Sequence, residues 1–174
     1  MKLTVQREKI TDALQKLTSI IGSRTTLPIL NNVLIKADND VLHMETTDLD
    51  IRISTQIEAA VEKKGSTTVP AKRFLQFIKD FQGANITLES NESHSLQIDS
   101  GESSYKLHGI SPDDFPIPNT FPSIRKINIP QIDLFRYFNL ILYAVSADDS
   151  RKVLNGVFIS VKANMLTTVA TDGK

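Results

Sequence analysis

Apolar residues recur at steps of three and four along three segments of the chain. They are Ile10, Ala13, Leu14, Leu17 and Ile20 in the first segment, Phe74, Phe77, Ile78 and Phe81 in the second, and Leu134, Phe138, Ile141, Leu142 and Val145 in the third. This spacing predicts three amphipathic helices, each with one face for a sheet and one for water or a ligand.

Short strands are predicted on both sides of the helices. One is expected before each helix, around residues 3–5, 67–69 and 127–129. Three alternating runs follow each of the first two helices: "NNVLIKA", "VLHMETT" and "DIRISTQIEA", then "NITLES", "SLQIDS" and "SYKLHGI". The turn residues "DND", "SNES" and "SGES" separate them. A unit of strand, helix and three-stranded meander predicts an α+β fold with helices on one face of antiparallel sheets.

The chain also repeats itself. Residues 30–50 align without a gap on residues 154–174. The segment around the second predicted helix also resembles the segment around the first helix, with weaker similarity. The repeat and a proline-rich stretch, "SPDDFPIPNTFPSIRK", predict one domain over 1–123, with half-units 1–62 and 63–123. Residues 124–174 would form the first half of a second domain. We expect that half-domain to be poorly ordered or completed by a partner, and a closed second sheet would contradict this.

Composition narrows the function classes. Of the 174 residues 40% are hydrophobic and 23% charged, as in ordinary globular proteins. The chain has no cysteine, which excludes disulfides, cysteine zinc sites and a thiol nucleophile. Twenty basic residues balance twenty acidic ones, so any contact with nucleic acid must rely on a local patch or on geometry. The first residues have no apolar signal region, and the most apolar later stretch contains Arg136, so we expect a cytoplasmic, unanchored protein.

Catalytic patterns are weak. His43, His94 and His108 are scattered without metal-ligand spacing, and the glycines form no phosphate-binding loop. Asp48 with Asp50, or Asp148 with Asp149, could be imagined as acid/base pairs, but such carboxylates are more often turns and caps. We therefore expect no enzyme, no metal and no cofactor, and a hydrolase using these aspartates is the least favoured hypothesis.

Several motifs occur together and in order: "RTTLPILNNVLI", "TTVPAKRF", "DDFP", "LNGVFI" and "TVATDGK". With the repeated strand-helix-meander, the whole chain closely resembles the beta subunit of bacterial DNA polymerase III, the sliding clamp family. The resemblance implies the DNA-clamp fold, with three similar domains per subunit and two subunits closing around duplex DNA, helices lining the hole. This chain resembles domain one and the first half of domain two. The implied function is a processivity factor that tethers the replicative polymerase; the alternative is a repeat-built peptide-binding scaffold without DNA encirclement.

The resemblance also implies site residues. Arg24, Lys72 and Arg73 match DNA-contacting positions, although basic helix faces are ordinarily just solvated. Residues of a pocket that receives short peptide motifs of the clamp loader, the polymerase and repair proteins are matched by Arg151, Leu154, Thr171, Gly173 and Lys174. Asp172 is interpreted as a turn residue. Lys174 stands where the family often has His.

The ring-closing surface of the family is matched by Arg73, Ile78, Phe81, Tyr105 and Leu107. An edge strand with apolar residues needs a partner or a cover, which favours this interpretation. The alternative is that Ile78, Phe81 and Leu107 belong to the domain core. The sequence has Ser95, Glu102 and Ser104 where relatives carry basic residues near this edge, so the family's ionic pairs are not expected here.

Overall fold

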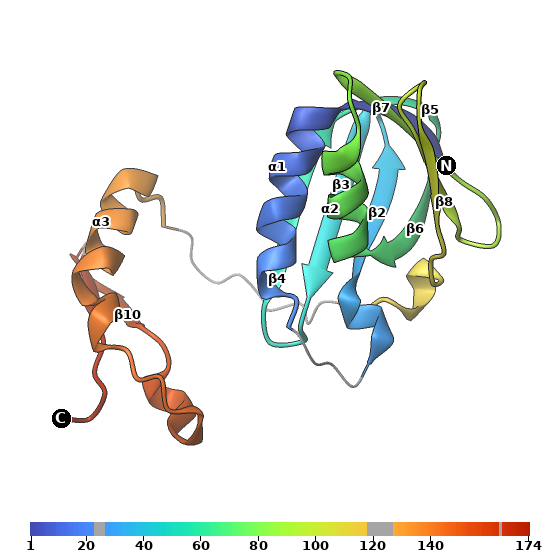
Figure 1. Cartoon of the computed structure of the whole chain (residues 1–174). Helices are drawn as coiled ribbons and strands as arrows, with labels where there is room; N and C mark the ends of the chain where they lie inside the picture. The colour runs from blue at the N-terminus through green and yellow to red at the C-terminus, as the bar shows by residue number, and fades with distance from the viewer. Residues whose placement is uncertain (23–26, 118–126, 164) are drawn as a thin grey trace. The chain divides into compact units, whose positions relative to one another are not determined.

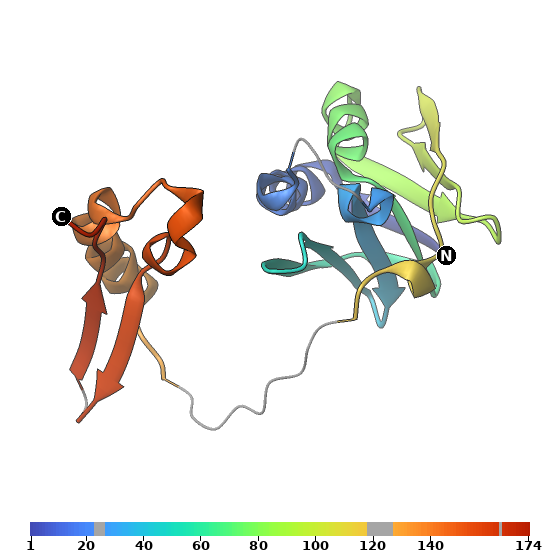
Figure 2. The same cartoon turned by 90° about the horizontal axis from the view of Figure 1, so that it is seen from below.

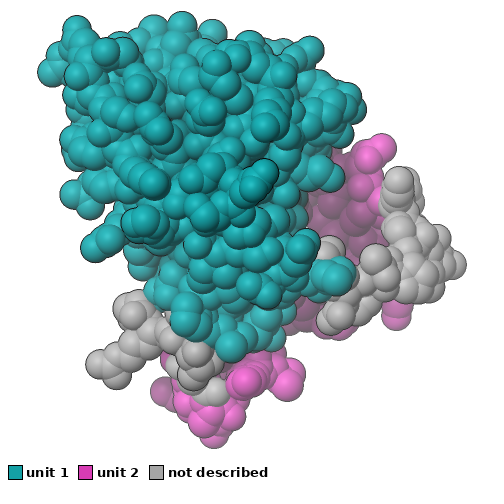
Figure 3. Space-filling view, turned by 90° about the vertical axis from the view of Figure 1, so that its right-hand side faces the viewer, with its two compact units in different colours: residues 1–119 teal, residues 120–174 magenta. Residues whose placement is uncertain are grey.

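The chain divides into two compact units, residues 1–119 and 120–174, coloured separately in Figure 3. The structure is a computed structural model that describes residues 1–22, 27–117, 127–163 and 165–174. We call the two parts unit 1 and unit 2 and describe each by itself.

Unit 1 begins with a strand that runs directly into a helix. Its elements are β1 (Lys2–Gln6), α1 (Arg7–Leu17), η1 (Thr18–Ile20), η2 (Pro28–Asn31), β2 (Asn32–Asp38), β3 (Val41–Thr47), β4 (Arg52–Glu58), β5 (Ala60–Lys63), β6 (Gly65–Pro70), α2 (Ala71–Asp80), β7 (Asn85–Ser90), β8 (Leu96–Asp99), β9 (Ser104–Leu107) and η3 (Pro112–Asp114), where η marks a short 3-10 helix. The predicted helix over Phe74–Phe81 ends one residue early, since Phe81 is already extended.

Two antiparallel sheets carry these strands, in the orders β5-β1-β7-β8-β9 and β4-β3-β2-β6. Helices α1 and α2 lie side by side against them (Figures 1 and 2). The α+β prediction is confirmed. The extra strand β5 was not predicted, because its four residues follow β4 after a single residue and carry no turn signal.

The leading strands exchange sheets between the two half-units. Strand β1 pairs with β7 of the second half, with Leu3 opposite Leu88. Strand β6 pairs with β2 of the first half, with Val69 opposite Val33. Each half therefore needs the other to complete its sheet.

The core of unit 1 lies between the helices and the sheets. Helix α1 contributes Leu14 and Leu17, α2 contributes Phe74 and Ile78, and all four are fully buried. Burial of each such side chain stabilises the fold by about 1.5–3 kcal/mol. The helical spacing in the sequence therefore identified the buried faces correctly.

Unit 2 contains α3 (Gln131–Ile141), η4 (Leu142–Ala144), η5 (Asp149–Leu154), β10 (Phe158–Lys162) and β11 (Met165–Val169). The strand predicted at 127–129 is wrong, because these residues form no ladder. In unit 1 the equivalent strand β1 pairs with β5 and β7, whose counterparts in the repeat are not among the 174 residues.

Helix α3 contacts β11 but covers the sheet of unit 2 only in part. Ile159 of β10 is 50% exposed, whereas its repeat counterpart Ile35 is fully buried. No residue of α3 is buried. The described residues of unit 2 form one two-stranded sheet, so the closed second sheet that would contradict our expectation is not formed there.

No described helix has both the length and the apolar character that a membrane span requires.

Candidate functional site

A tight turn follows β11 at the end of unit 2. The Thr171 hydroxyl oxygen accepts a hydrogen bond from the Gly173 N–H at 3.0 Å, and the Asp172 carboxylate accepts one from the Lys174 N–H at 3.0 Å. Gly173 has φ of 89°, in the left-handed region that glycine adopts without strain. Asp172 is thus a turn residue, as the sequence analysis expected.

The structure brings Arg151 and Leu154 to this turn. A Cβ atom placed on Gly173 would lie 3.3 Å from an Arg151 guanidinium nitrogen and 3.5 Å from the Leu154 Cδ1 methyl group. A side chain at Gly173 would touch the Leu154 methyl group and press against the Arg151 guanidinium group. Arg151, Leu154, Thr171 and Gly173, four of the five predicted pocket residues, therefore meet in one place, and Lys174 follows directly in the chain.

Segment η5 positions Arg151 and Leu154. The Asp148 carboxylate accepts a hydrogen bond from the Ser150 N–H at 2.9 Å and caps the start of η5. A hydrogen bond from the Ser150 side chain, with help from the Ser150 backbone N–H, lowers the pKa of the Asp148 carboxyl group below its ordinary value of 3.8. The sequence interpretation of this aspartate as a cap is therefore correct.

The chemistry of this cluster suits a peptide with apolar and acidic groups. Leu154 is half-buried and offers apolar area, while Arg151 and Lys174 are exposed and cationic. The methylene stem of an arginine covers apolar surface while its guanidinium group binds carboxylates. We name these five residues, Arg151, Leu154, Thr171, Gly173 and Lys174, the candidate pocket.

The basic residues of α1 and α2 form a second candidate site. Lys72 and Arg73 are exposed at the start of α2, and the Lys72 ammonium group donates a hydrogen bond to the Gly22 carbonyl oxygen at 3.4 Å. Lys16 and Lys79 are exposed as well. Arg24 lies outside the described residues.

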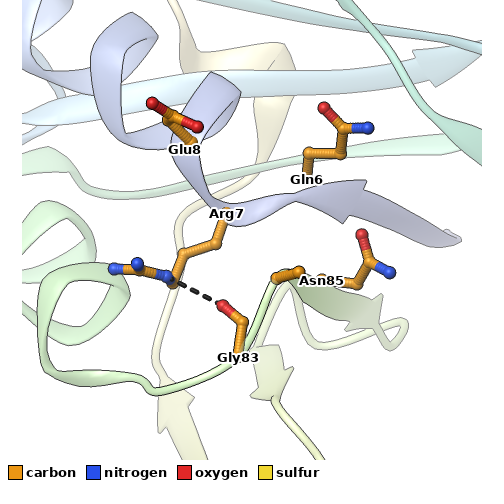
Figure 4. Close-up of a pocket in the computed structure, with 6 residues that line it drawn as sticks. Gln6, Arg7, Glu8, Gly83 and Asn85 are labelled. Carbon is orange, nitrogen blue, oxygen red and sulfur yellow. Dashed lines mark hydrogen bonds between the residues drawn. The ribbon is translucent and has the colours of Figure 1, made fainter.

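Two other cations of α1 are held by neighbouring groups. The Lys9 ammonium group lies 3.0 Å from a Glu58 carboxylate oxygen. The Arg7 side chain donates to the Gly83 carbonyl oxygen at 2.9 Å, at a surface pocket of about 610 Å³ that Gln6, Glu8, Ala84 and Asn85 also line (Figure 4). The Lys9 ammonium group, paired with a carboxylate, is therefore less available to a phosphate than that of Lys72, whose hydrogen bond is to a neutral carbonyl oxygen.

Strand β9 forms an edge of the five-stranded sheet. Tyr105 on this strand is 38% exposed and stacks on Phe77, with ring centroids 4.5 Å apart and an interplanar angle of 7°. Phe81 lies 5.3 Å away at a tilt of 58°. Phe77 was missed by the sequence analysis as a residue of this edge, although its place one turn before Phe81 on the apolar stripe was a signal.

The predicted ring-closing residues fall into a buried group and an exposed group. Ile78, Phe81 and Leu107 lie in the core of unit 1, as the alternative interpretation expected. Only Tyr105 and Arg73 have exposed side chains. Among the predicted residues and Phe77, the apolar side chains that remain accessible at this edge are therefore those of Tyr105 and Phe77.

Acidic and imidazole side chains do not gather into a metal site in the described part of the chain, where no three such groups lie close enough to share an ion.

Comparisons with known proteins relate this chain to bacterial sliding clamps. The profile described as "DNA polymerase III beta subunit, N-terminal domain" matches residues 1–120. The beta sliding clamp of Chlamydia pneumoniae is 33% identical over 174 residues, which are all of this chain and 48% of that protein. The beta sliding clamp of Escherichia coli K12 is 32% identical over 176 positions, covering 99% of this chain and 48% of its own length.

A solved structure supports the same relationship. The DNA polymerase III subunit beta from Pseudomonas aeruginosa, bound to griselimycin, superposes with a TM-score of 0.92 at 30% identity. The superposition covers 99% of this chain and 47% of the other. The DNA-clamp fold is thereby confirmed, and the chain spans about half the length of these relatives. Because the profile covers more than half of the chain, the chain belongs to the DNA polymerase III beta subunit family.

Proposed function

We propose that the chain is part of a DNA sliding clamp, a processivity factor that encircles duplex DNA and tethers the replicative polymerase and other DNA-acting proteins. The observation that carries the proposal is the match of the entire chain, in sequence and in backbone, to beta sliding clamps. Unit 1 corresponds to clamp domain one, and unit 2 corresponds to the first half of domain two. The protein acts in the cytoplasm, without a catalytic step of its own.

The DNA-facing surface is the polar side of α1 and α2. Arg24, Lys72 and Arg73 contact phosphates, aided by Lys16 and Lys79. Phosphate contacts carry no sequence information, which suits a protein that slides. A formal net charge of zero is compatible with this role, because a closed ring stays on DNA by topology rather than by affinity.

The candidate pocket receives short peptide motifs of the clamp loader, the polymerase and repair proteins. An apolar anchor of the peptide packs on Leu154, and its acidic groups bind Arg151 and Lys174. The approach of Arg151 and Leu154 to Gly173 supports this assignment, since both groups border the same bare backbone. Thr171 contributes by holding the turn.

The edge strand β9 provides the contact with a second subunit. Its outer side has no strand partner among the described residues. Tyr105 and Arg73 supply exposed aromatic and cationic groups there, while Ile78, Phe81 and Leu107 stabilise the strand from within the core.

Topological linkage is the property to test. The full-length protein is loaded onto a nicked circular plasmid by its clamp loader, and retention is measured by gel filtration at high salt before and after linearisation. We expect stable retention on the circle and rapid release from the linear form. Equal retention on both forms contradicts encirclement. Peptide binding without any retention on the circle favours the alternative, a peptide-binding scaffold without a DNA role.

A further inference from the structure

Asn155 and Gly156 lie where η5 passes into β10, and no other asparagine of the chain is followed by glycine. Both residues are exposed. The Asn155 N–H donates to the Lys152 carbonyl oxygen at the end of η5. An asparagine before a glycine is prone to lose its side-chain amide, because glycine has no Cβ to shield its backbone nitrogen from the asparagine side chain.

The Gly156 nitrogen is accessible in this structure. Among the residues that the structure describes, none accepts a hydrogen bond from the Gly156 N–H. A Cβ atom built on Gly156 would have no atom within 4 Å. Water therefore reaches this nitrogen, and no hydrogen bond has to break before it reacts.

The backbone around Gly156 can rotate without loss of a strand or helix. The ψ angle of Asn155 is 9°, and ring closure needs the Gly156 nitrogen to swing toward the Asn155 side chain. Residues 155–157 belong to no helix or strand, and the N–H groups of Gly156 and Val157 donate no hydrogen bond to the described residues. The swing therefore breaks no hydrogen bond that these two groups donate.

The Asp172–Gly173 step closes the same kind of ring by losing water, but its reacting groups are occupied. The Gly173 N–H donates to the Thr171 hydroxyl oxygen at 3.0 Å, and the Asp172 carboxylate accepts from the Lys174 N–H at 3.0 Å. Both hydrogen bonds have to break before the Gly173 nitrogen attacks the Asp172 carboxyl carbon. We therefore expect this step to react more slowly than Asn155–Gly156.

The repeat shows the same position in a unit that has both half-units. Asn31 of unit 1 is the counterpart of Asn155 and is exposed as well, at the junction of η2 and β2. Exposure at this position therefore persists where the second half-unit is present. Asn32 replaces Gly156, and its N–H donates to the Ile29 carbonyl oxygen. Unit 1 thus has neither the glycine nor the unoccupied nitrogen.

We propose that Asn155–Gly156 is a site of spontaneous deamidation. The Gly156 nitrogen attacks the Asn155 side-chain carbonyl carbon, and the new C–N bond closes a succinimide ring. The side-chain amide nitrogen leaves as ammonia and takes up the proton of the Gly156 N–H. Water then adds to either carbonyl carbon of the ring and opens it to aspartate or isoaspartate.

The product adds a negative charge directly after Leu154 of the candidate pocket. A carboxylate at this place repels the acidic groups of a peptide that binds there. Isoaspartate also lengthens the main chain of the segment that carries Leu154. This effect on peptide binding rests on the proposed function, whereas the modification itself does not.

Peptide mapping by mass spectrometry tests the site on the folded 174-residue chain. The chain is incubated at mildly alkaline pH and digested at acidic pH, so that no conversion occurs during digestion. We expect Asn155 to convert at least about tenfold faster than Asn31. Gly156→Ala should slow the conversion about tenfold or more at an unchanged melting temperature, because its Cβ shields the nitrogen and meets no other atom. Conversion no faster than at Asn31, or equally fast in Gly156→Ala, overturns the proposal.

Asn155→Asp in the full-length protein measures the effect on the candidate pocket. The probe is a short peptide with leucine and phenylalanine anchors flanked by aspartates, titrated by calorimetry. We expect about fivefold weaker binding to Asn155→Asp than to the wild type, and equal binding to the uncharged control Asn155→Gln. Equal affinity of Asn155→Asp and the wild type overturns the link to the pocket. A wild type that binds no such peptide counts against the proposed function and leaves the measured conversion rates valid.

Discussion

Thr47 and Thr171 make the same hydrogen bond at equivalent turns of the two units. Each hydroxyl oxygen accepts from the N–H two residues on, and the aspartate that follows repeats the pattern. The hydrogen bonds fix the backbone of the turn, whereas the residue at its apex determines which group is exposed at the surface. Leu49 presents an apolar side chain, and Gly173 presents bare backbone beside Arg151.

Leu154 is the apolar member of the candidate pocket, so its substitution tests the pocket directly. Leu154→Asp in the full-length protein should weaken a clamp-binding peptide by about thirtyfold or more, since hot-spot truncation costs at least about 2 kcal/mol and a carboxylate adds desolvation. Isothermal titration calorimetry measures the affinity. Leu154→Met keeps the apolar area and should bind nearly as the wild type does. Unchanged affinity in Leu154→Asp would remove this residue from the pocket.

Asp148 gives the cap of η5, the segment that carries Arg151 and Leu154, a pH dependence. Hydrogen bonds from Ser150 lower the pKa of the Asp148 carboxyl group below 3.8, so the charged form is favoured in the folded chain. The cap is therefore fully present above pH 3.8 and is lost as the pH falls through the lowered pKa. Carbon-detected NMR titration should find the Asp148 midpoint below 3.8, and Ser150→Ala should raise it. A midpoint that Ser150→Ala does not move would contradict the side-chain hydrogen bond from Ser150, whereas the cap through the Ser150 backbone N–H is present in both variants.

At the level of elements, the periodic patterns were the reliable part of the sequence. The apolar stripes of α1 and α2 are buried where the three- and four-residue steps predicted, and β3 occupies the predicted run "VLHMETT". The exchange of β1 and β6 between the half-units was not predictable, because alternation indicates that a strand exists and leaves its partner open. The false strand at 127–129 has a different cause, because the counterparts of β5 and β7 that would pair with it are not among the 174 residues.

The candidate sites were predictable to different degrees. The convergence of Arg151, Leu154 and Gly173 follows from the family resemblance, since these residues are separated along the chain. At the β9 edge, apolar residue type could not separate the core residue Leu107 from a docking residue. Only burial distinguishes the two roles, and it leaves Tyr105 as the exposed aromatic residue of the strand.

Gly109 determines how the chain passes from β9 across β6. A Cβ atom there would lie 2.2 Å from the carbonyl oxygens of both Thr68 and His94, a clash that only backbone movement can relieve. The segment after β9 is also tied to β6 by the Thr68 hydroxyl group, which donates to the Ile110 carbonyl oxygen at 2.8 Å. The two sheets are therefore joined at a point with no room for a side chain.

Gly109→Ala should destabilise unit 1 by about 3 kcal/mol, at the upper end of the usual cost of overpacking. Urea denaturation followed by far-ultraviolet circular dichroism measures the change. Gly156→Ala is the matched control, because no atom lies within 4 Å of the added Cβ and the backbone is not left-handed. A loss of less than about 1 kcal/mol in Gly109→Ala would mean that the crossing can open at little cost.

On the scale of the whole molecule, the two units differ in how completely they bury their apolar residues. Unit 1 encloses a continuous core built from both sheets and both helices. In unit 2 apolar residues face solvent on the helix and on both strands, including Phe135, Leu140, Phe158 and Val161. Stability in proteins follows buried apolar area, so the units are expected to open at very different free energies.

Hydrogen exchange of the 174-residue chain should separate the two units. Amides of β2 and β3 should exchange only through global unfolding of unit 1, because their strands carry Ile35, Leu42 and Met44 in the core. Amides of α3 should exchange at least about a hundredfold faster, because burial of its helix face is incomplete and about 3 kcal/mol less stabilisation corresponds to that factor. A denaturant series with mass-spectrometric detection measures both classes. If α3 and β3 were protected equally, unit 2 would owe its stability to packing beyond its own residues.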